Sequence, residues 1–294
     1  MFPSIHSLKV ALSVTTLTVL LSGCYQERNE SIRLMNQGLK FAKMNKQSRA
    51  VEFLRKAAKT DPTNHRALFY EGMILGQKMG EPEAAEPLLR RALELNSKHH
   101  EYHYQLAVVL SDTQRWEMVV STLGDALELN PEHAESHYRL AVAYEHLEQV
   151  DNAQRSYREA IRNNTRLPQA YARLGNLYRQ FEKYSHAAHV FKNGIENNPK
   201  NAMNYRELGL VYRSQERHGD ALEQFSKALK LDPGHAGTLF NMGITHAANQ
   251  QAAKGLQYLT RYMSRRASDE DPLRLRTAER LITKLKTAIS RRKK

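Results

Sequence analysis

The sequence predicts an all-α solenoid of about seven helix-turn-helix repeats, closed by a C-terminal capping helix. Small residues recur about every 34 positions, two stretches in each repeat carry apolar residues with helical spacing, and most repeats end at a proline. The composition, with 41% hydrophobic and 26% charged residues, suits a folded body. The predicted repeats cover residues 31–267 and begin at Ser31, His65, His100, Ala134, Pro168, Ala202 and Ala236.

Residues 1–23 have the pattern of a secretory signal peptide. Lys9 supplies a positive charge, residues 10–21 form an uncharged apolar run, and Ser22 and Gly23 are small. The run is shorter than the roughly 20 residues that a membrane-spanning helix needs. Cys24 follows directly and is the only cysteine in the sequence, so it cannot form a disulfide within the chain.

The segment from Leu21 to Cys24 resembles a bacterial lipobox. The resemblance implies that the Cys24 thiol is acylated, that the chain is cut before it, and that lipid holds the mature protein to a membrane. Residues 24–30 are then the lipidated cysteine and a short linker. Tyr25 stands where similar lipoproteins of the inner membrane carry aspartate, which favours the outer membrane of a bacterial envelope. The alternative is an ordinary signal peptide or an uncleaved anchor.

The first helix of each predicted repeat has a small residue at its eighth position. A large side chain does not fit where the two helices of a repeat pack closely, so glycine is accepted despite its cost of about 1 kcal/mol in a helix. Three positions later a large residue fills the space between helices, although His246 departs from this series in the last repeat. The small residues are Gly38, Gly72, Ala107, Ala141, Gly175, Gly209 and Gly243.

The second helix of each repeat carries small, large and small residues spaced four and three positions apart, which is the apolar stripe of an amphipathic helix. Ala187, Phe191 and Gly194 show this stripe in the fifth repeat. Four of these helices are expected to end just before a proline, because the residue before proline is pushed out of the helical region. These prolines are Pro62, Pro131, Pro199 and Pro233.

The combined pattern resembles the tetratricopeptide repeat family over residues 31 to about 264. The resemblance implies a right-handed solenoid whose first helices line a concave, ligand-binding face. Two repeats depart from the family pattern. Repeat two has one extra residue near Gly76 and Gly80, and repeat seven has Gly255 and Tyr262 where alanine is expected, as terminal repeats often do.

In this family the fifth and ninth positions of the first helices face the ligand. Here they are mostly apolar or aromatic, which predicts a groove for an amphipathic helix or an apolar extended segment. Nearby arginines predict a preference for an acidic flank, and the alternative is that some of these residues are core or solvated edge. The predicted partner-binding residues are Phe69, Met73, Tyr104, Val108, Tyr138, Val142 and Asn176, together with Arg139, Arg173 and Arg206.

Two features of the family are not expected here. The chaperone-binding branch grips a terminal carboxylate with lysine at the fifth position and asparagine at the ninth, but Asn176 is paired with Ala172. Histidines near residues 100, 133 and 186 have spacings that one helix face could present to a metal. A packing role is favoured, because His103 and His137 fall at the fourth position, where the family has a large packing residue. The sequence therefore predicts no metal and no cofactor.

Residues 268–294 are expected to form a capping helix and a basic tail. An apolar face includes Leu275, Ile282 and Leu285, which would cover the open end of the solenoid. Residues 261–294 hold twelve basic and four acidic side chains, a net charge of +8 out of +13 for the chain. This segment is suited to an anionic partner or simply to solvation, and export makes nucleic acid an unlikely ligand.

The sequence lacks a nucleophile motif, a glycine-rich phosphate loop and a metal-ligand box, so we expect no enzyme. The combination of lipobox and repeats resembles lipoproteins that aid pilus or secretin assembly, including pilotins. We therefore expect a membrane-anchored scaffold for an envelope assembly component. The alternatives are an adaptor for an envelope protease or peptidoglycan enzyme, and a structural part of a polysaccharide export complex. The partner and the oligomeric state stay open.

We expect Cys24→Ala to release the protein from membranes while leaving the repeats folded, because the acyl chains supply the anchor. Fractionation measures the release, and circular dichroism checks the helices. A variant that stays in the membrane fraction would refute lipid anchoring at this residue.

Overall fold

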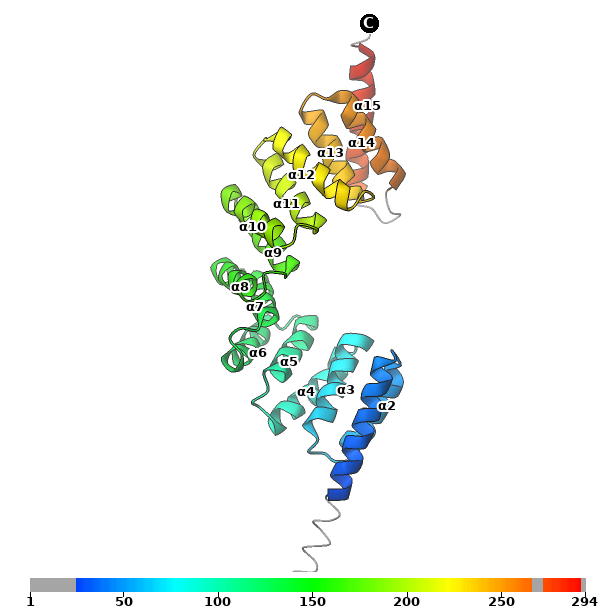
Figure 1. Cartoon of the computed structure of the whole chain (residues 1–294), viewed down its shortest axis with the longest axis vertical. Coiled ribbons are helices and arrows are strands. Elements are labelled where there is room, and N and C mark those ends of the chain that lie inside the picture. The colour runs from blue at the N-terminus through cyan, green and yellow to red at the C-terminus, as the bar shows by residue number, and fades with distance from the viewer. Residues whose placement is uncertain (1–24, 266–271, 292–294) are drawn as a thin grey trace, which may run out of the picture. The chain divides into compact units, whose positions relative to one another are not determined.

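The computed structural model describes residues 25–265 and 272–291, and within these ranges it contains helices and turns but no strand. The chain divides into two compact bodies, an N-terminal body of residues 1–153 and a C-terminal body of residues 154–294. Figure 1 shows consecutive helices packed in pairs within each body. We call the first helix of a repeat its A helix and the second its B helix.

The N-terminal body begins with a helix described over 25–43, which is the first A helix. The following A helices are α3, α5 and α7, and the B helices are α2, α4 and α6. Helix α8 (Val150–Asn163) crosses from one body into the other. The bounds are α2 Gln47–Thr60, α3 His65–Ile74, η1 Leu75–Met79, α4 Pro82–Leu95, α5 His100–Asp112, α6 Trp116–Leu129 and α7 Ala134–His146.

The C-terminal body continues the same alternation and ends with a single long helix. Its A helices are α9, α11 and α13, and the B helices that follow them are α10, α12 and α14. The bounds are α9 Pro168–Gln180, α10 Tyr184–Asn197, α11 Ala202–Ser214, α12 His218–Leu231, α13 Ala236–Ala248, α14 Ala252–Arg265 and α15 Pro272–Arg291.

The A helices of repeats two to seven begin at the residues predicted from the sequence. The first repeat differs, because residues 25–30, predicted to be a linker, are already helical. Ser31 is buried in the middle of this helix, and its hydroxyl donates a 2.7 Å hydrogen bond to the carbonyl of Ala57. The predicted linker of residues 25–30 is therefore helical instead of extended, while the predicted signal peptide and Cys24 lie outside the described residues.

The eighth position of the A helix is where the two helices of a repeat approach most closely. A Cβ atom on Gly175 would lie 2.3 Å from Cζ of Phe191, and one on Gly209 would lie 2.6 Å from Cε1 of Phe225. Real Cβ atoms do not come this close to another carbon, so the aromatic ring occupies the space that an alanine methyl would need. The predicted reason for small residues at this position is confirmed.

Each A helix is followed by a left-handed residue, at the fifteenth position of its repeat or, in repeat two with its extra residue, at the sixteenth. Glu148 has φ 58°, and the backbone N–H of Gln149 donates to the carbonyl of Tyr144 at 2.8 Å, which satisfies a carbonyl at the helix end. Only repeat two uses glycine, at Gly80, among the described residues with positive φ. The other left-handed residues are Asn45, Gln114, Glu182, Glu216 and Gln250.

The extra residue of repeat two is absorbed inside its A helix. Residues 75–79 form a short π-helix, η1, which continues α3 and ends at Gly80. A π-turn closes over one more residue than an α-turn, so the insertion widens the last turn of the helix. Gly80 still lies two residues before α4, as the left-handed residue of every other repeat lies two residues before its B helix. The neighbouring Gly76 packs on α5, since a Cβ there would lie 2.9 Å from Cγ2 of Val109.

Helix α15 covers the end of the C-terminal body, as predicted. Ala278 and Leu285 are buried in one cluster with Leu239, Leu259 and Tyr262. Tyr262, which departs from the family pattern, is fully buried in this cluster. None of the described helices is long and apolar enough to cross a membrane.

Replacing Gly175 by alanine is expected to lower the free energy of unfolding by about 1–3 kcal/mol, because the methyl group collides with Phe191. The matched control is Gly124→Ala in α6, where no atom lies within 4 Å of the added Cβ. This control should raise stability by up to about 1 kcal/mol through helix propensity. Urea unfolding measures both, and equal shifts would contradict the close approach.

Candidate functional site

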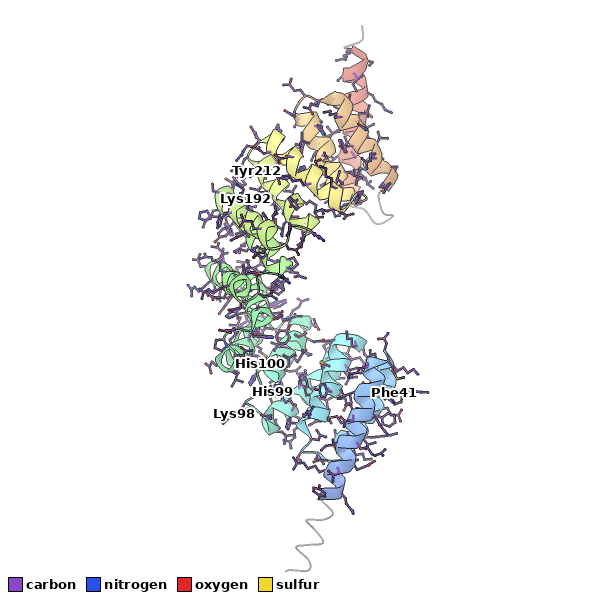
Figure 2. All side chains as sticks on the ribbon, viewed as in Figure 1. Phe41, Lys98, His99, His100, Lys192 and Tyr212 are labelled. Carbon is purple, nitrogen blue, oxygen red and sulfur yellow. The ribbon has the colours of Figure 1, made fainter. Side chains whose placement is uncertain are left out.

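A cavity of about 540 Å³ opens on the A helices of the N-terminal body, between α3 and the start of α5. Predicted groove residues Phe69 and Met73 line it from α3. Figure 2 shows His99 and His100 at the start of α5, where His99 forms part of the opposite wall. The remaining lining residues are His65, Arg66, Tyr70, Glu101 and Tyr102.

The floor of this cavity is a stack of rings. The Phe69 ring lies 4.3 Å from that of Tyr102, and the Tyr102 ring lies 4.5 Å from that of His99, in each case between centroids. His65 Nδ1 is 2.8 Å from the Tyr102 hydroxyl. Burial raises the pKa of Tyr102 to about 12, so this hydroxyl stays protonated at neutral pH. The cavity thus offers aromatic surface that rests on a buried, hydrogen-bonded tyrosine.

Helix α3 also carries a buried carboxylate, Glu71, which directly follows Phe69 and Tyr70 in the sequence. Glu71 is 2% exposed and accepts a 2.9 Å hydrogen bond from Nε of Arg55 on α2. Burial raises the pKa of Glu71, and the contact with Arg55 acts in the opposite direction. The exposed Arg55 side chain therefore only partly offsets the cost of burying this charge.

The next pair of A helices, α5 and α7, carries a second aromatic contact. Arg139 donates from Nε to the Tyr104 hydroxyl at 3.1 Å, and its guanidinium lies 5.7 Å from the centre of the Tyr104 ring. The rings of Tyr104 and His133 are nearly perpendicular, at 79°, with their centroids 5.0 Å apart. The structure therefore brings together two predicted site residues, and Tyr138 and Val142 lie half-buried on the same helix, α7.

Val108 is another predicted partner-binding residue. It is 5% exposed on α5, and it lines none of the described cavities. Its role as a partner contact therefore stays a prediction. Phe69 is equally buried, but its ring forms the cavity floor and stays available to a ligand.

The A helices of the C-terminal body have a different character, because arginines gather there around one acid. Glu207 is 3.8 Å from Arg206, and burial raises its pKa against the opposing effects of Arg206 and Arg179. Burial lowers the pKa of Arg213, and the nearby Arg179 lowers it further. Asn176 accepts a 3.1 Å hydrogen bond from Arg179. These contacts place positive charge around a buried carboxylate, and the predicted preference for an acidic flank stays a prediction.

Arg173 is placed differently from the other predicted arginines. It is exposed on α9, whereas Arg206 is half-buried on α11 beside Glu207. Asn176 lies between α9 arginines and contacts Arg179 rather than open space. Asn176 and Arg206 therefore form part of a network of contacts within the C-terminal body.

One group of side chains has the donor types of a metal site. Possible ligand atoms of His100, Glu101 and His133 lie within 4.8 Å of one another. A tetrahedral zinc site has four ligands at about 2.0–2.2 Å, which places them roughly 3.4 Å apart. His133 also holds Ser136 at 2.7 Å through Nδ1. As arranged, these three residues do not form a closed zinc site.

Several cavity residues were not among the predicted partner-binding residues, because only the fifth and ninth positions were used for that assignment. His65, Tyr70 and Tyr102 occupy the first, sixth and third positions of their A helices. The sequence signal that could have identified them is the high number of aromatic and histidine residues at the start of α3 and α5. The stacking of their rings could not be predicted, because it depends on how adjacent repeats pack against each other.

Family models described as tetratricopeptide repeat match this chain at residues 77–117 and 172–236, and at residues 122–155. No curated protein sequence matches the chain.

Solved structures of the same fold are numerous. The C-terminal part of a TPR protein from Cytophaga hutchinsonii gives a TM-score of 0.68 at 12% identity, covering 82% of this chain and 98% of that one. PilF of Pseudomonas aeruginosa gives 0.60 at 19% identity, covering 76% and 99%. YrrB, a TPR protein with an unusual peptide-binding site, gives 0.52 at 22% identity, covering 65% and 97%.

Glu71→Gln is expected to raise the melting temperature at pH 7, because it removes a buried charge and keeps the shape and an acceptor for Arg55. The pKa of Glu71 is raised in the folded state, so the proton it binds stabilises the fold. This contribution is complete below the unfolded pKa of 4.5 and is lost as pH rises through the folded pKa. The advantage of the variant should therefore vanish below about pH 4.5.

The matched control is Glu52→Gln, which removes an exposed carboxylate paired with Lys56 at 2.6 Å on α2. Exposed pairs contribute little, so this variant should melt close to the wild type at pH 7. Thermal melts from pH 4 to pH 8 make the measurement. A Glu71→Gln gain that persists unchanged at the acidic end would contradict the raised pKa.

Proposed function

Because the chain is a tetratricopeptide repeat protein, we propose that it is a non-catalytic scaffold that holds a protein partner on the A helices. The observation that carries this proposal is the aromatic cavity between α3 and α5. Such a cavity gives a bulky apolar side chain a place to become buried, which is how a few residues supply most of the affinity of an interface.

The chemistry of the cavity indicates the kind of segment that it would accept. Phe69 and Met73 provide apolar surface, and the half-buried His65 and the exposed Arg66 provide polar groups at the rim. An amphipathic helix or an extended segment with an aromatic or long aliphatic residue fits these surfaces. The arginines of the C-terminal body, Arg173 and Arg206 among them, suit acidic residues of the same or another partner segment.

The proposal includes a lipid anchor at Cys24 and a place in the outer membrane of a bacterial envelope. The support is the lipobox-like segment from Leu21 to Cys24, the single cysteine, and Tyr25 in place of aspartate. Two or three acyl chains bind a membrane firmly, whereas one is marginal. The scaffold would then act close to the bilayer.

For the biological role we propose assembly of an envelope complex such as a pilus or a secretin. The support is the resemblance to pilotin-like lipoproteins, which combine a bare lipobox with a short array of these repeats. The expected partner is a secretin or pilus subunit with an apolar segment that must be shielded from water before assembly.

Met73→Glu is the variant that tests the cavity, because a carboxylate placed among Phe69 and Tyr70 opposes burial of an apolar ligand. The matched control is Met118→Glu, at a methionine that is 39% exposed on the B helix α6. We expect the cavity variant to reduce recovery of the crosslinked partner roughly tenfold or more. Circular dichroism establishes that both variants are folded.

Quantitative mass spectrometry of crosslinked envelopes identifies what is recovered. Loss of a secretin or pilus subunit with Met73→Glu but not with Met118→Glu would support the assembly role. Recovery of cell-wall enzymes or polysaccharide exporters in its place would overturn that role while keeping the scaffold. Equal recovery with both variants would overturn the cavity as the binding site.

A further inference from the structure

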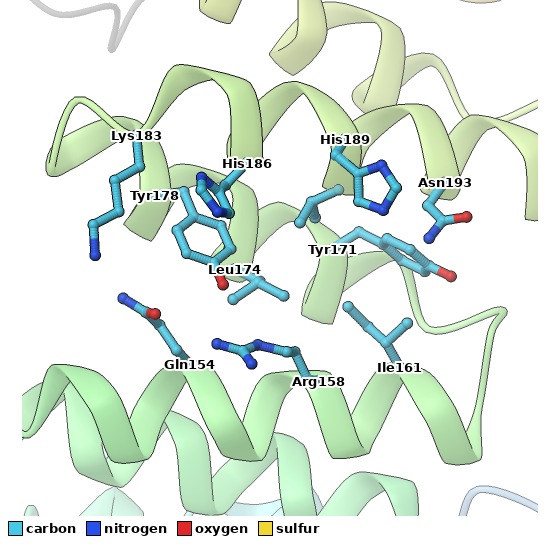
Figure 3. A pocket seen from close by; sticks show the side chains of 11 residues that line it. Gln154, Arg158, Ile161, Tyr171, Leu174, Tyr178, Lys183, His186, His189 and Asn193 are labelled. Atoms are coloured by element: carbon cyan, nitrogen blue, oxygen red, sulfur yellow. The ribbon is translucent and has the colours of Figure 1, made fainter.

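A second cavity, of about 550 Å³, lies in the C-terminal body on the side of the B helices. Figure 3 shows it between α8 and α10, with side chains of α9 behind it. Gln154, Arg158 and Ile161 reach it from α8, and His186, His189 and Asn193 reach it from α10. The A-helix face described above contributes none of these six residues.

The base of this cavity is apolar. Leu174 and Tyr178 of α9 and Val190 of α10 are buried there. Tyr171 is also buried, and its hydroxyl already donates to the carbonyl of Thr165 at 3.2 Å. The ring of Tyr178 lies 5.3 Å from that of His186. An occupant would therefore gain by burying an apolar group on this base.

The rim of the cavity is cationic. Arg158 on α8 and Lys183 in the turn before α10 are exposed, and among the described residues neither has an ion-pair partner. No aspartate or glutamate is among the described residues that line the cavity. The nearest acid on α8, Glu159, pairs instead with Arg162 at 2.9 Å. The uncompensated charge makes the cavity attractive to an anion.

Gln154 supplies an independent sign of a missing ligand. Its side chain is 5% exposed and points into the cavity beside Lys183 and Tyr178, as Figure 3 shows. The Nε2 atom of this amide is buried and has no hydrogen-bond acceptor in the described part of the chain. Leaving a buried donor unpaired costs about 1–3 kcal/mol, so an acceptor placed there would recover that energy.

We propose that this cavity is a second partner-binding site, which takes an acidic side chain and an adjacent aromatic or aliphatic side chain of a peptide segment. The carboxylate accepts hydrogen bonds from Gln154 and is paired by Arg158 and Lys183, and the apolar neighbour covers Leu174 and Tyr178. The apolar base and the volume favour a peptide over a small inorganic anion. The site lies on B helices, so it can be occupied independently of the A-helix cavity.

The probe is a fluorescein-labelled peptide of alternating glutamate and phenylalanine, titrated against the purified full chain by fluorescence anisotropy. Arg158→Gln combined with Lys183→Gln should weaken binding about tenfold or more, since both charges that face the carboxylate are removed. The matched control combines Arg155→Gln with Lys192→Gln, which removes the same charge from exposed positions of α8 and α10 outside the cavity. The control should bind the probe with a Kd close to that of the wild type.

Gln154→Met keeps the side-chain length and removes the unpaired donor, so it should weaken the probe several-fold without lowering the melting temperature. Met73→Glu should leave the Kd unchanged, which separates this site from the proposed function. The proposal is overturned if the wild type does not bind the probe, or if the control loses as much affinity as the cavity variant. It is also overturned if a peptide with glutamine in place of glutamate binds equally well. The same holds if millimolar inorganic phosphate displaces the probe and a peptide without phenylalanine binds as tightly as the probe.

Discussion

The whole array depends on how closely the two helices of a repeat approach at the eighth position of the A helix. The space there is filled by one small residue of the A helix and one large residue of the B helix. Gly175 and Gly209 each face a phenylalanine, Gly72 faces Leu89, and Ala107 lies in the repeat whose B helix carries Leu123. A larger residue on one helix therefore requires a smaller one on the other, and the pair sets the distance on which every other contact is built. Because each repeat contacts mainly its neighbours, this local rule is enough to propagate the fold.

Side chains of the A helices that take no part in this packing differ between the two bodies. On the A helices of the N-terminal body the rings of Phe69, Tyr102 and His99 stack into a cavity wall. On the A helices of the C-terminal body, arginines surround the buried carboxylate of Glu207. The fold thus fixes where side chains are presented, while the residues at those positions determine what kind of partner segment each body can bind.

Much of the fold could be predicted from the sequence, because helix starts and helix contacts follow the spacing of small and large residues. His65 and Pro168 begin their helices as expected, and the extra residue of repeat two lies where the spacing placed it. The candidate site was less predictable. Val108 occupies a ligand-facing position by family pattern but is only 5% exposed, and the cavity lined by Gln154 depends on three helices from two repeats. Such features arise from side-chain conformations between repeats, which a periodic pattern within one repeat does not specify.

The early start of the first helix affects how the protein would meet its partners. A helix advances about 1.5 Å per residue, so the six residues between Cys24 and Ser31 reach about 9 Å instead of the roughly 20 Å of an extended tether. A lipid on Cys24 would then connect to the first repeat through a short, rigid helix, which would limit how far the repeats can reorient relative to the membrane. Encounters with a partner in the same membrane become a search in two dimensions, in which lateral diffusion and effective concentration govern occupancy more than the strength of any single contact.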